Sequence, residues 1–234
     1  MARFRQYGAC LALVQLAIAC SPSAPEQNGS NRVMATAPIS SADTAVPADT
    51  KLVLVFGDSL YAGYNLGPSE GLAPVLEQAL TAGSLKALVV NGGVSGDTSA
   101  AGLARLAFTL DGLPRKPDLV LVGLGGNDML RGLEPDATRA NLAAIITELQ
   151  KRGLPVMLTG MLASPNMGPD YAGAFNPIYP DLAKKFGVPL YPFFLHGVID
   201  HRELKLPDGI HPNAKGVATI VARLSPMVAN KLEK

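Results

Sequence analysis

Cysteine is scarce in this chain: only Cys10 and Cys20 occur among its 234 residues. Cys10 lies in an apolar segment, Ala9 to Ile18, that follows two arginines and ends in small residues, which is the pattern of a secretory signal. Cleavage before Cys20 would leave that thiol without a disulfide partner, so no disulfide is expected in the mature protein. We predict that residues 1–19 are a signal peptide and that the protein is exported, either to the periplasm or to a lipid anchor at the cell envelope.

The sequence also lacks long apolar runs, an excess of charge of either sign, and histidines spaced as metal ligands. After the signal, no run of eighteen or more apolar residues occurs, so no membrane-spanning helix is expected. The formal net charge is +1 and the lysines and arginines are scattered, which argues against nucleic acid as a partner. His196 and His201 are five residues apart with no second-ligand spacing, so we expect no metal site.

Residues 20–50 are predicted to form a flexible tether. From residue 21 to residue 50 the chain is rich in Ser, Pro, Ala, Thr and Asn, with no aromatic residue and no apolar periodicity. Such a stretch cannot bury enough apolar surface to offset the entropy lost on ordering. Cys20 at its start fits two processing patterns. One is lipidation, although Ala17 stands where the lipoprotein signal usually has leucine, and the other is ordinary cleavage at a small-x-small site. Lipidation would turn the stretch into a spacer between a membrane and the domain.

The remaining residues, 51–234, alternate short apolar runs with segments of helical periodicity. The runs predict strands at 52–56, 87–90, 119–124, 156–159 and 188–191, and four of them are almost continuously apolar, as strands buried on both faces are. Helical periodicity covers 72–80, 103–110, 142–149, 175–186 and a segment from about 213; prolines make the fourth irregular, and Pro226 is expected to interrupt the last. This alternation predicts a three-layer α/β/α sandwich with a five-stranded parallel sheet.

Polar and glycine-rich segments follow the predicted strands. Asp58 and Ser59 follow the first strand, residues 91–97 the second and residues 125–128 the third, and residues 208–212 lie past the fifth. In open parallel sheets, ligands bind beyond the carboxyl ends of the strands. The sequence therefore predicts that these segments meet at one edge of the sheet and form one site.

Three side chains in these segments are the minimum set for covalent acyl transfer. Ser59 is the candidate nucleophile, His211 the candidate base, and Asp208 the candidate acid that orients the imidazole. Pro212 biases His211 toward an extended backbone, from which Asp208 can reach Nδ1 and leave Nε2 free for the serine proton. Each has an alternative when taken singly: Ser59 as a turn serine that caps the next segment, and Asp208 as part of an ordinary Asp-Gly turn.

Donors for the oxyanion that forms during acyl transfer are also available. The candidates are the backbone N–H groups of Ser59 and Gly96 and the side-chain amide of Asn127. Gly96 permits close approach of the backbone, and the amide of Asn127 is neutral. Taken singly, both are also common turn residues.

Together the four segments resemble the SGNH (GDSL) hydrolase superfamily, and within it the TesA-like group of bacterial arylesterases, acyl-CoA thioesterases and lysophospholipases. The matching motifs are Gly57-Asp58-Ser59-Leu60, Ser95-Gly96-Asp97-Thr98, Gly125-Gly126-Asn127-Asp128 and Asp208-Gly209-Ile210-His211-Pro212. The resemblance implies a flavodoxin-like SGNH hydrolase fold for residues 51–234 and catalytic roles for Ser59, Asp208 and His211. It also implies an oxyanion hole of Ser59, Gly96 and Asn127, with no metal and no organic cofactor.

Two loops are expected to select the acyl group. Residues 129–133 and 160–171 contain the candidate substrate-binding residues Met129, Leu130, Met161, Leu162 and Met167. Because methionine adapts to varied shapes, we predict an apolar groove for short or medium acyl chains. Packing in the core or the loops is the alternative for these side chains.

The sequence thus predicts a serine esterase that acts on small-molecule ester or lipid substrates through an acyl-enzyme at Ser59. Aryl esters and short-to-medium acyl esters are the expected substrates, with thioesters and lysophospholipids as further candidates, whereas export argues against cytosolic acyl-CoA. Two alternatives stay open. One is a carbohydrate O-acetylesterase of the cell envelope, and the other is a non-catalytic lipid-binding lipoprotein on the same scaffold.

Overall fold

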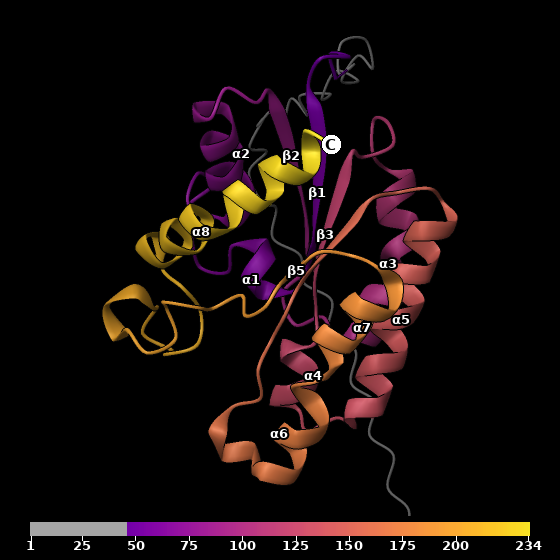
Figure 1. Cartoon of the computed structure of the whole chain (residues 1–234). Coiled ribbons are helices and arrows are strands. Elements are labelled where there is room, and N and C mark those ends of the chain that lie inside the picture. Colours follow the sequence, from indigo (N-terminus) through magenta and orange to yellow (C-terminus); the bar gives the residue numbers. More distant parts are fainter. Residues whose placement is uncertain (1–45) are drawn as a thin grey trace, which may run out of the picture. The chain divides into compact units, whose positions relative to one another are not determined.

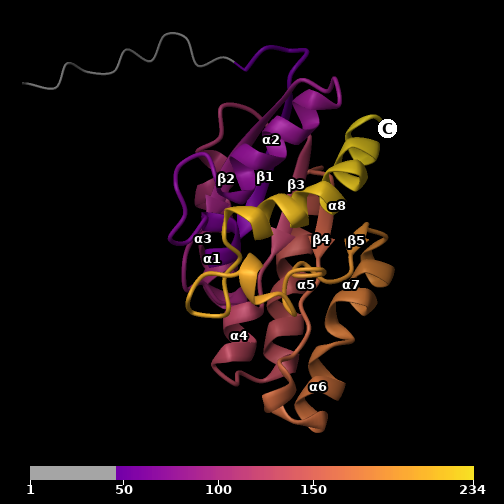
Figure 2. The same ribbon diagram turned by 90° about the vertical axis from the view of Figure 1, so that its left-hand side faces the viewer.

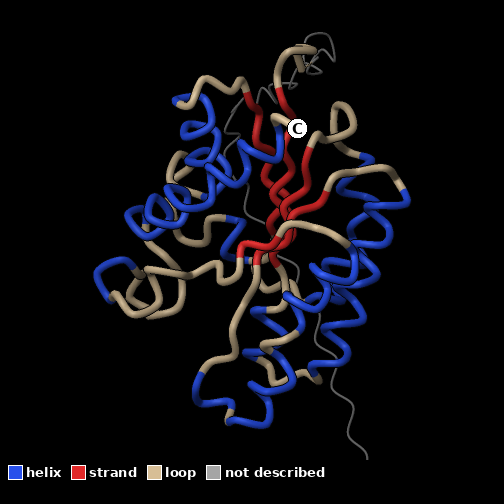
Figure 3. Tube along the Cα trace, viewed as in Figure 1, coloured by secondary structure: helices blue, strands red, loops and turns tan. Residues whose placement is uncertain are grey.

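A five-stranded parallel sheet forms the centre of the computed structural model, which describes residues 46–234 (Figures 1 and 3). Its strands are β1 (Lys51–Gly57), β2 (Ala87–Gly93), β3 (Leu119–Gly123), β4 (Val156–Thr159) and β5 (Leu190–Tyr191). Neighbouring strands pair in parallel in the order β2-β1-β3-β4-β5. This is the flavodoxin-like order, and the predicted fold is confirmed. The predicted signal peptide, Cys20 and most of the tether lie outside the described residues.

Helices cover both faces of the sheet (Figures 1 and 2). α2 (Leu72–Ala82) and α8 (Ala214–Leu232) pack on one face, and α3 (Ser99–Asp111), α5 (Pro135–Lys151) and α7 (Ile178–Phe186) pack on the other. Successive side chains of a strand point to opposite faces, and β1 shows it: Val53 and Val55 lie in the core with α2 and α8, whereas Leu54 and Phe56 lie in the core with α3 and α5. No helix in the described part of the chain is both long and apolar enough to cross a membrane.

Short elements cluster at the carboxyl ends of the strands. They are α1 (Ser59–Ala62) after β1, α4 (Gly126–Leu130) after β3, and the turn η1 (Pro165–Met167) with α6 (Pro169–Phe175) after β4; η2 (Arg202–Leu204) precedes α8. Figure 1 shows α4 and α6 together at the end of the molecule where the strands finish. The sequence pattern does not predict α1 and α4, since helices of four or five residues are too short to show a helical period.

Strand β2 differs from the expectation of buried apolar strands. It lies at the edge of the sheet, where it pairs only with β1, and Leu88 is 36% exposed. Its apolar composition therefore does not correspond to burial on both faces.

The prolines of the last helices act differently from one another. The predicted helix over 175–186 is divided, because α6 ends at Phe175 and α7 begins at Ile178, just after Pro177. The predicted interruption at Pro226 is wrong, since α8 continues through it to Leu232. Pro226 is exposed, while Leu224 and Val228 on the inner face are buried on either side of it. Burial of that face outweighs the loss of one backbone hydrogen bond.

Residues 47–50, at the end of the predicted tether, form a turn against the domain. The N–H of Thr50 donates to the carbonyl oxygen of Pro47 at 3.0 Å, and Arg115 Nη2 donates to the carbonyl oxygen of Thr50 at 2.6 Å. Asp49 pairs with Lys86 in front of β2. Residues 47–50 thus contact the domain next to β1 and β2.

Candidate active site

Ser59 is the first residue of α1, directly beyond the carboxyl end of β1. Asp58 caps this short helix, because its Oδ1 accepts the N–H of Leu60 at 3.0 Å. A Cβ atom at Gly57 would lie 2.5 Å from the carbonyl oxygen of Gly123, so the tight passage from strand to helix requires glycine there. The local sequence thereby presents the hydroxyl of Ser59 at the edge of the sheet.

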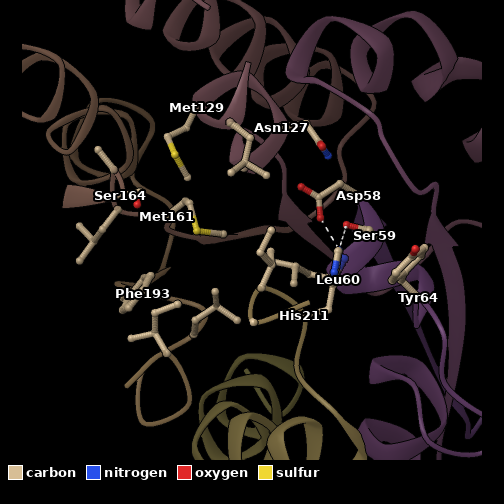
Figure 4. A pocket seen from close by; sticks show the side chains of 18 of the residues that line it. Asp58, Ser59, Leu60, Tyr64, Asn127, Met129, Met161, Ser164, Phe193 and His211 are labelled. Atoms are coloured by element: carbon tan, nitrogen blue, oxygen red, sulfur yellow. Dashed lines mark hydrogen bonds between the residues drawn. The ribbon is translucent and has the colours of Figure 1, made fainter. Parts of the chain in front are cut away.

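Ser59, His211 and Asp208 form a hydrogen-bonded chain. His211 Nε2 lies 2.8 Å from Ser59 Oγ, and His211 Nδ1 lies 2.7 Å from Asp208 Oδ2. Figure 4 shows the side chains of Ser59 and His211 turned toward each other. The residues are 152 positions apart in sequence, and the fold brings them together at the carboxyl edge of the sheet.

Backbone hydrogen bonds hold Asp208 in its orientation. Its Oδ1 accepts the N–H groups of Ile210 at 2.9 Å and His211 at 3.0 Å, so Oδ2 is left for the imidazole. Partial burial raises the pKa of Asp208, but the hydrogen bonds from Ile210 and His211 outweigh it and keep the pKa below its ordinary value. The carboxylate is therefore ionised at neutral pH and fixes the proton of His211 on Nδ1.

Tyr64 covers one side of the imidazole. Its ring centroid lies 4.5 Å from that of His211 with an angle of 37° between the ring planes. Figure 4 shows Tyr64 beside Ser59 at the border of the cavity. Tyr64 is not among the predicted site residues.

The predicted oxyanion donors surround the same cavity. Gly96 has φ of 87°, in the region that favours glycine, and Asn127 lies in α4, whose N-cap Gly125 has φ of 108°. One N–H of the Asn127 amide donates to the carbonyl oxygen of Asp97 at 2.9 Å. Ser59, Gly96 and Asn127 all line the cavity, each from a segment that follows a different strand.

The cavity has a volume of about 620 Å³ and a largely apolar wall. Met129, Leu130, Met161 and Leu162 line it as predicted. The sulfur-bearing side chains of Met129 and Met161 extend toward its interior in Figure 4. Met167 does not line the cavity: it belongs to η1 and packs against the core under α5 and α6, so the prediction that it contacts substrate is not supported by its position.

Apolar residues beyond β5 complete the wall. Phe193, Leu195 and Ile199 lie between β5 and η2 and face the cavity. These residues are not among the predicted site residues, although they follow the fifth strand and so lie at the same edge as the residues after the other four strands. That positional rule is the signal that identifies them.

Asp58 is a second carboxyl group beside the nucleophile. Only 2% of its surface is exposed. Burial, with smaller contributions from the carboxylates of Asp128 and Asp97, raises its pKa to about 7. Asp58 is therefore only partly ionised near pH 7, whereas Asp208 is ionised.

Within residues 46–234, no three or more His, Cys, Asp and Glu side chains gather in a way that could hold a metal ion. His201 is exposed, and its Nδ1 lies 3.0 Å from Glu203 Oε1. His196 accepts a hydrogen bond from Arg223 through its carbonyl oxygen.

Comparison with known proteins finds a matching family model and similar proteins whose names agree with it. The family model of the GDSL-like lipase/acylhydrolase family matches residues 55–218. An arylesterase of Vibrio mimicus is 39% identical over 183 residues, which cover 77% of this chain and 90% of that protein. A protein of Escherichia coli K12 named thioesterase 1/protease 1/lysophospholipase L1 is 43% identical over 169 residues, covering 72% of this chain and 78% of that one.

A solved structure agrees with the fold and the sequence similarity. The crystal structure of AlinE4, an SGNH-hydrolase family esterase, is 48% identical with a TM-score of 0.68. The match covers 79% of this chain and 98% of AlinE4.

Proposed function

The chain belongs to the GDSL-like lipase/acylhydrolase family, and from that membership we propose that Ser59, His211 and Asp208 are its catalytic residues. It is a serine hydrolase that acts on ester bonds. The observation that carries the proposal is the hydrogen-bonded chain from Asp208 Oδ2 through His211 to Ser59 Oγ. A hydroxyl becomes a nucleophile when a neighbouring base can take its proton, and this chain supplies that base with its orienting carboxylate.

The reaction divides into two similar halves. Ser59 Oγ attacks the ester carbonyl carbon while His211 Nε2 takes the serine proton, and the tetrahedral intermediate forms with its charge on the former carbonyl oxygen. His211 then gives the proton to the departing alkoxide, which leaves an acyl group on Ser59. Water repeats the sequence: it loses a proton to Nε2, attacks the acyl carbon, and the carboxylic acid is released as Ser59 recovers its proton.

The oxyanion is stabilised by donors from three segments. These are the N–H groups of Ser59 and Gly96 and the amide of Asn127, which keeps its second N–H for the oxyanion after bonding to Asp97. Such fixed donors lower the barrier because they point at a charge that develops only in the transition state.

The wall of the cavity supports esters with apolar groups as substrates. Its methionines and leucines can hold an aryl or a short-to-medium acyl group. Relatives named arylesterase and thioesterase/lysophospholipase make aryl esters, thioesters and lysophospholipids the first compounds to test. The carbohydrate O-acetylesterase alternative is not favoured, since this wall offers sugars few polar partners. The hydrogen bond between Ser59 and His211 disfavours the alternative of a non-catalytic lipid-binding protein, which would not need a base beside this serine.

Export and lipidation of Cys20 complete the proposal. The N-terminal residues 1–19 have the sequence of a secretory signal, and Cys20 is the candidate for a lipid anchor to the cell envelope. Mass spectrometry of the mature N-terminus separates the two processing patterns. A diacylglycerol-modified Cys20 supports the anchor, and an unmodified N-terminus at or after Cys20 contradicts it.

Ser59→Ala tests the catalytic assignment. We expect it to abolish labelling by a fluorophosphonate and to lower hydrolysis of p-nitrophenyl acetate by roughly 10⁴-fold or more, because the acyl-enzyme cannot form. Ser69→Ala removes an exposed serine outside the cavity and serves as the matched control, which should label as the wild type does. Wild-type hydrolysis by purified Ser59→Ala would show that the assignment is wrong.

A further inference from the structure

Arg105 joins two of the segments around Ser59 without lining the cavity itself. It lies on α3, its side chain is 20% exposed, and its Nε lies 2.5 Å from Asp97 Oδ2. Its Nη2 donates to the carbonyl oxygen of Gly57 at 2.9 Å, and the guanidinium carbon lies 4.2 Å from the centre of the Phe56 ring. Nη1 reaches Thr109 Oγ1 at 3.3 Å. The guanidinium is thus fixed in plane and in position.

Two of the three acceptors of Arg105, Gly57 and Asp97, are close in sequence to oxyanion donors. Gly57 precedes Ser59 by two residues, and Asp97 directly follows Gly96. The carbonyl oxygen of Asp97 also accepts the amide of Asn127 at 2.9 Å. One guanidinium is therefore linked to the three segments that supply the N–H groups of Ser59 and Gly96 and the amide of Asn127.

The loop that carries Gly96 is held by a small number of contacts, one of them from Arg131, whose Nη2 donates to the carbonyl oxygen of Gly96 at 2.7 Å. Ser95 and Gly96 are exposed, and glycine has more backbone freedom than any other residue. Two backbone hydrogen bonds shape the loop: the N–H of Val94 donates to Gly57 at 3.0 Å, and the N–H of Asp97 donates to Val94 at 3.2 Å. The carbonyl oxygen of Gly57 is thus shared by Val94 and Arg105. The carboxylate of Asp97, with its side chain 13% exposed, attaches the loop to Arg105 on α3, in addition to the contact that Arg131 makes with Gly96.

We propose that Arg105 is a positioning residue that sets the distances among the three oxyanion donors. This inference rests on the proposed function, since it assumes that Ser59, Gly96 and Asn127 stabilise the oxyanion. Displacement of a catalytic group by about 1 Å can cost roughly a hundredfold in rate. The apolar wall that binds the ester needs none of these donors, so loss of Arg105 should lower kcat and leave KM nearly unchanged.

Arg105→Met tests the proposal, because methionine keeps much of the length and loses the charge and the fork of donors. We expect kcat for p-nitrophenyl acetate to fall about tenfold to a hundredfold, with KM within about threefold of wild type. Arg105→Lys keeps the charge beside Asp97 but cannot reach both acceptors, so an intermediate kcat is expected. Circular dichroism and thermal denaturation verify that each variant is folded.

Arg139→Met is the matched control. It also removes an arginine–aspartate pair, in which Arg139 Nη1 lies 2.9 Å from Asp181 Oδ2, on a helix surface outside the site. Its kcat should equal that of wild type. If Arg105→Met is folded and retains wild-type kcat, the proposal is overturned. Should Arg105→Met fail to fold, Arg105→Lys is judged by the same two outcomes.

A double-mutant cycle with Asn127→Ala separates this inference from the proposed function. If Arg105 acts through the oxyanion donors, Arg105→Met should cost clearly less in kcat in the Asn127→Ala protein than in the wild type. If the two substitutions lower kcat independently, so that their fold-changes multiply in the double mutant, the positioning role of Arg105 is overturned while the assignment of the oxyanion hole is unaffected. If Asn127→Ala itself has wild-type kcat, the assigned oxyanion hole fails, and the role of Arg105 fails with it.

Discussion

Asp58 shows how the surroundings of a single residue set its charge. It is almost completely buried beside Ser59, and burial, followed by the nearby carboxylates of Asp128 and Asp97, raises its pKa to about 7. An aspartate in an unfolded chain titrates near pH 4. Between about pH 4 and pH 7 the folded protein therefore holds a proton that the unfolded chain has lost, and a rise in pH across this window favours unfolding.

Asp58→Asn tests this linkage at the residue scale. Asparagine keeps the oxygen that caps α1 through the N–H of Leu60 and cannot ionise. We expect the free energy of unfolding of the wild type to fall relative to that of the variant by on the order of 4 kcal/mol as pH rises from about 4 to about 7, with no further change above. Urea denaturation of both proteins across this range measures it. A difference between them that is independent of pH would contradict the raised pKa.

Single residues of the site were predictable to different degrees. Ser59, Asp208 and His211 could be proposed as catalytic residues because their side-chain chemistry is specific and Asp208 and His211 are three residues apart. Met167 was predicted to bind substrate but does not line the cavity, since a methionine in a loop shows no sign of which way it faces. Arg105 was missed because the role proposed for it depends on a contact with Gly57, which lies 48 residues away in sequence, as well as on Asp97.

At the scale of elements, α8 shows packing that overrides local preference. Pro226 cannot donate to the carbonyl oxygen of Ala222, and a proline inside a helix costs about 3 kcal/mol relative to alanine. The helix continues because its inner face, from Val217 to Leu232, is buried against the sheet and α2. The low helix propensity of proline therefore predicted an interruption at Pro226, but the tertiary contacts of α8 keep the helix continuous.

Pro226→Ala measures the cost that α8 tolerates. Since Pro226 is exposed, little packing is lost, and the variant regains one backbone hydrogen bond. We expect the free energy of unfolding to rise by about 1–3 kcal/mol, less than the full helix penalty because alanine also makes the unfolded chain more flexible. Urea denaturation gives the value, and unchanged hydrolysis of p-nitrophenyl acetate serves as the control. A destabilised variant would show that Pro226 fits α8 without strain.

Longer elements were predictable from the sequence, whereas the shortest ones were not. The periodicity of α2 and α5 spans several turns, and a glycine follows each of them at 83 and 153. α1, which carries Ser59, depends on its cap Asp58 and on contacts with β1 and β2, and α4, which carries Asn127, packs against α5. The elements that hold the site are thus those with the weakest local signal.

At the scale of the whole molecule, the cavity is a product of the sheet topology. Segments after all five strands contribute to its wall, together with residues 209–211 in front of α8. The alternation of strands and helices was enough to predict this meeting place, because carboxyl ends of parallel strands share one edge. The size and polarity of the cavity were not predictable, since they depend on how loops from β4 and β5 fold over it.

Met161 lies where these loops determine the space available to a substrate. It is half-buried, packs against the cores on both sides of the sheet, and lines the cavity from the segment after β4. A larger side chain there should shorten the groove for the acyl chain and leave the region around Ser59 open. We therefore expect Met161→Trp to change the preference for acyl length more than the chemical step.

A series of p-nitrophenyl esters from acetate to palmitate tests this expectation, because the leaving group stays constant while the acyl chain grows. In Met161→Trp, kcat/KM for esters with acyl chains of about ten carbons should fall at least tenfold, because each lost contact with a methylene costs about 1 kcal/mol or more. The kcat/KM for the acetate ester should stay within about threefold of wild type. Met227→Trp, an exposed methionine on α8 outside the cavity, is the matched control and should keep the wild-type profile. An equal loss at every chain length would place Met161 against the alcohol part of the ester, and would contradict an acyl groove built across the carboxyl edge of the sheet.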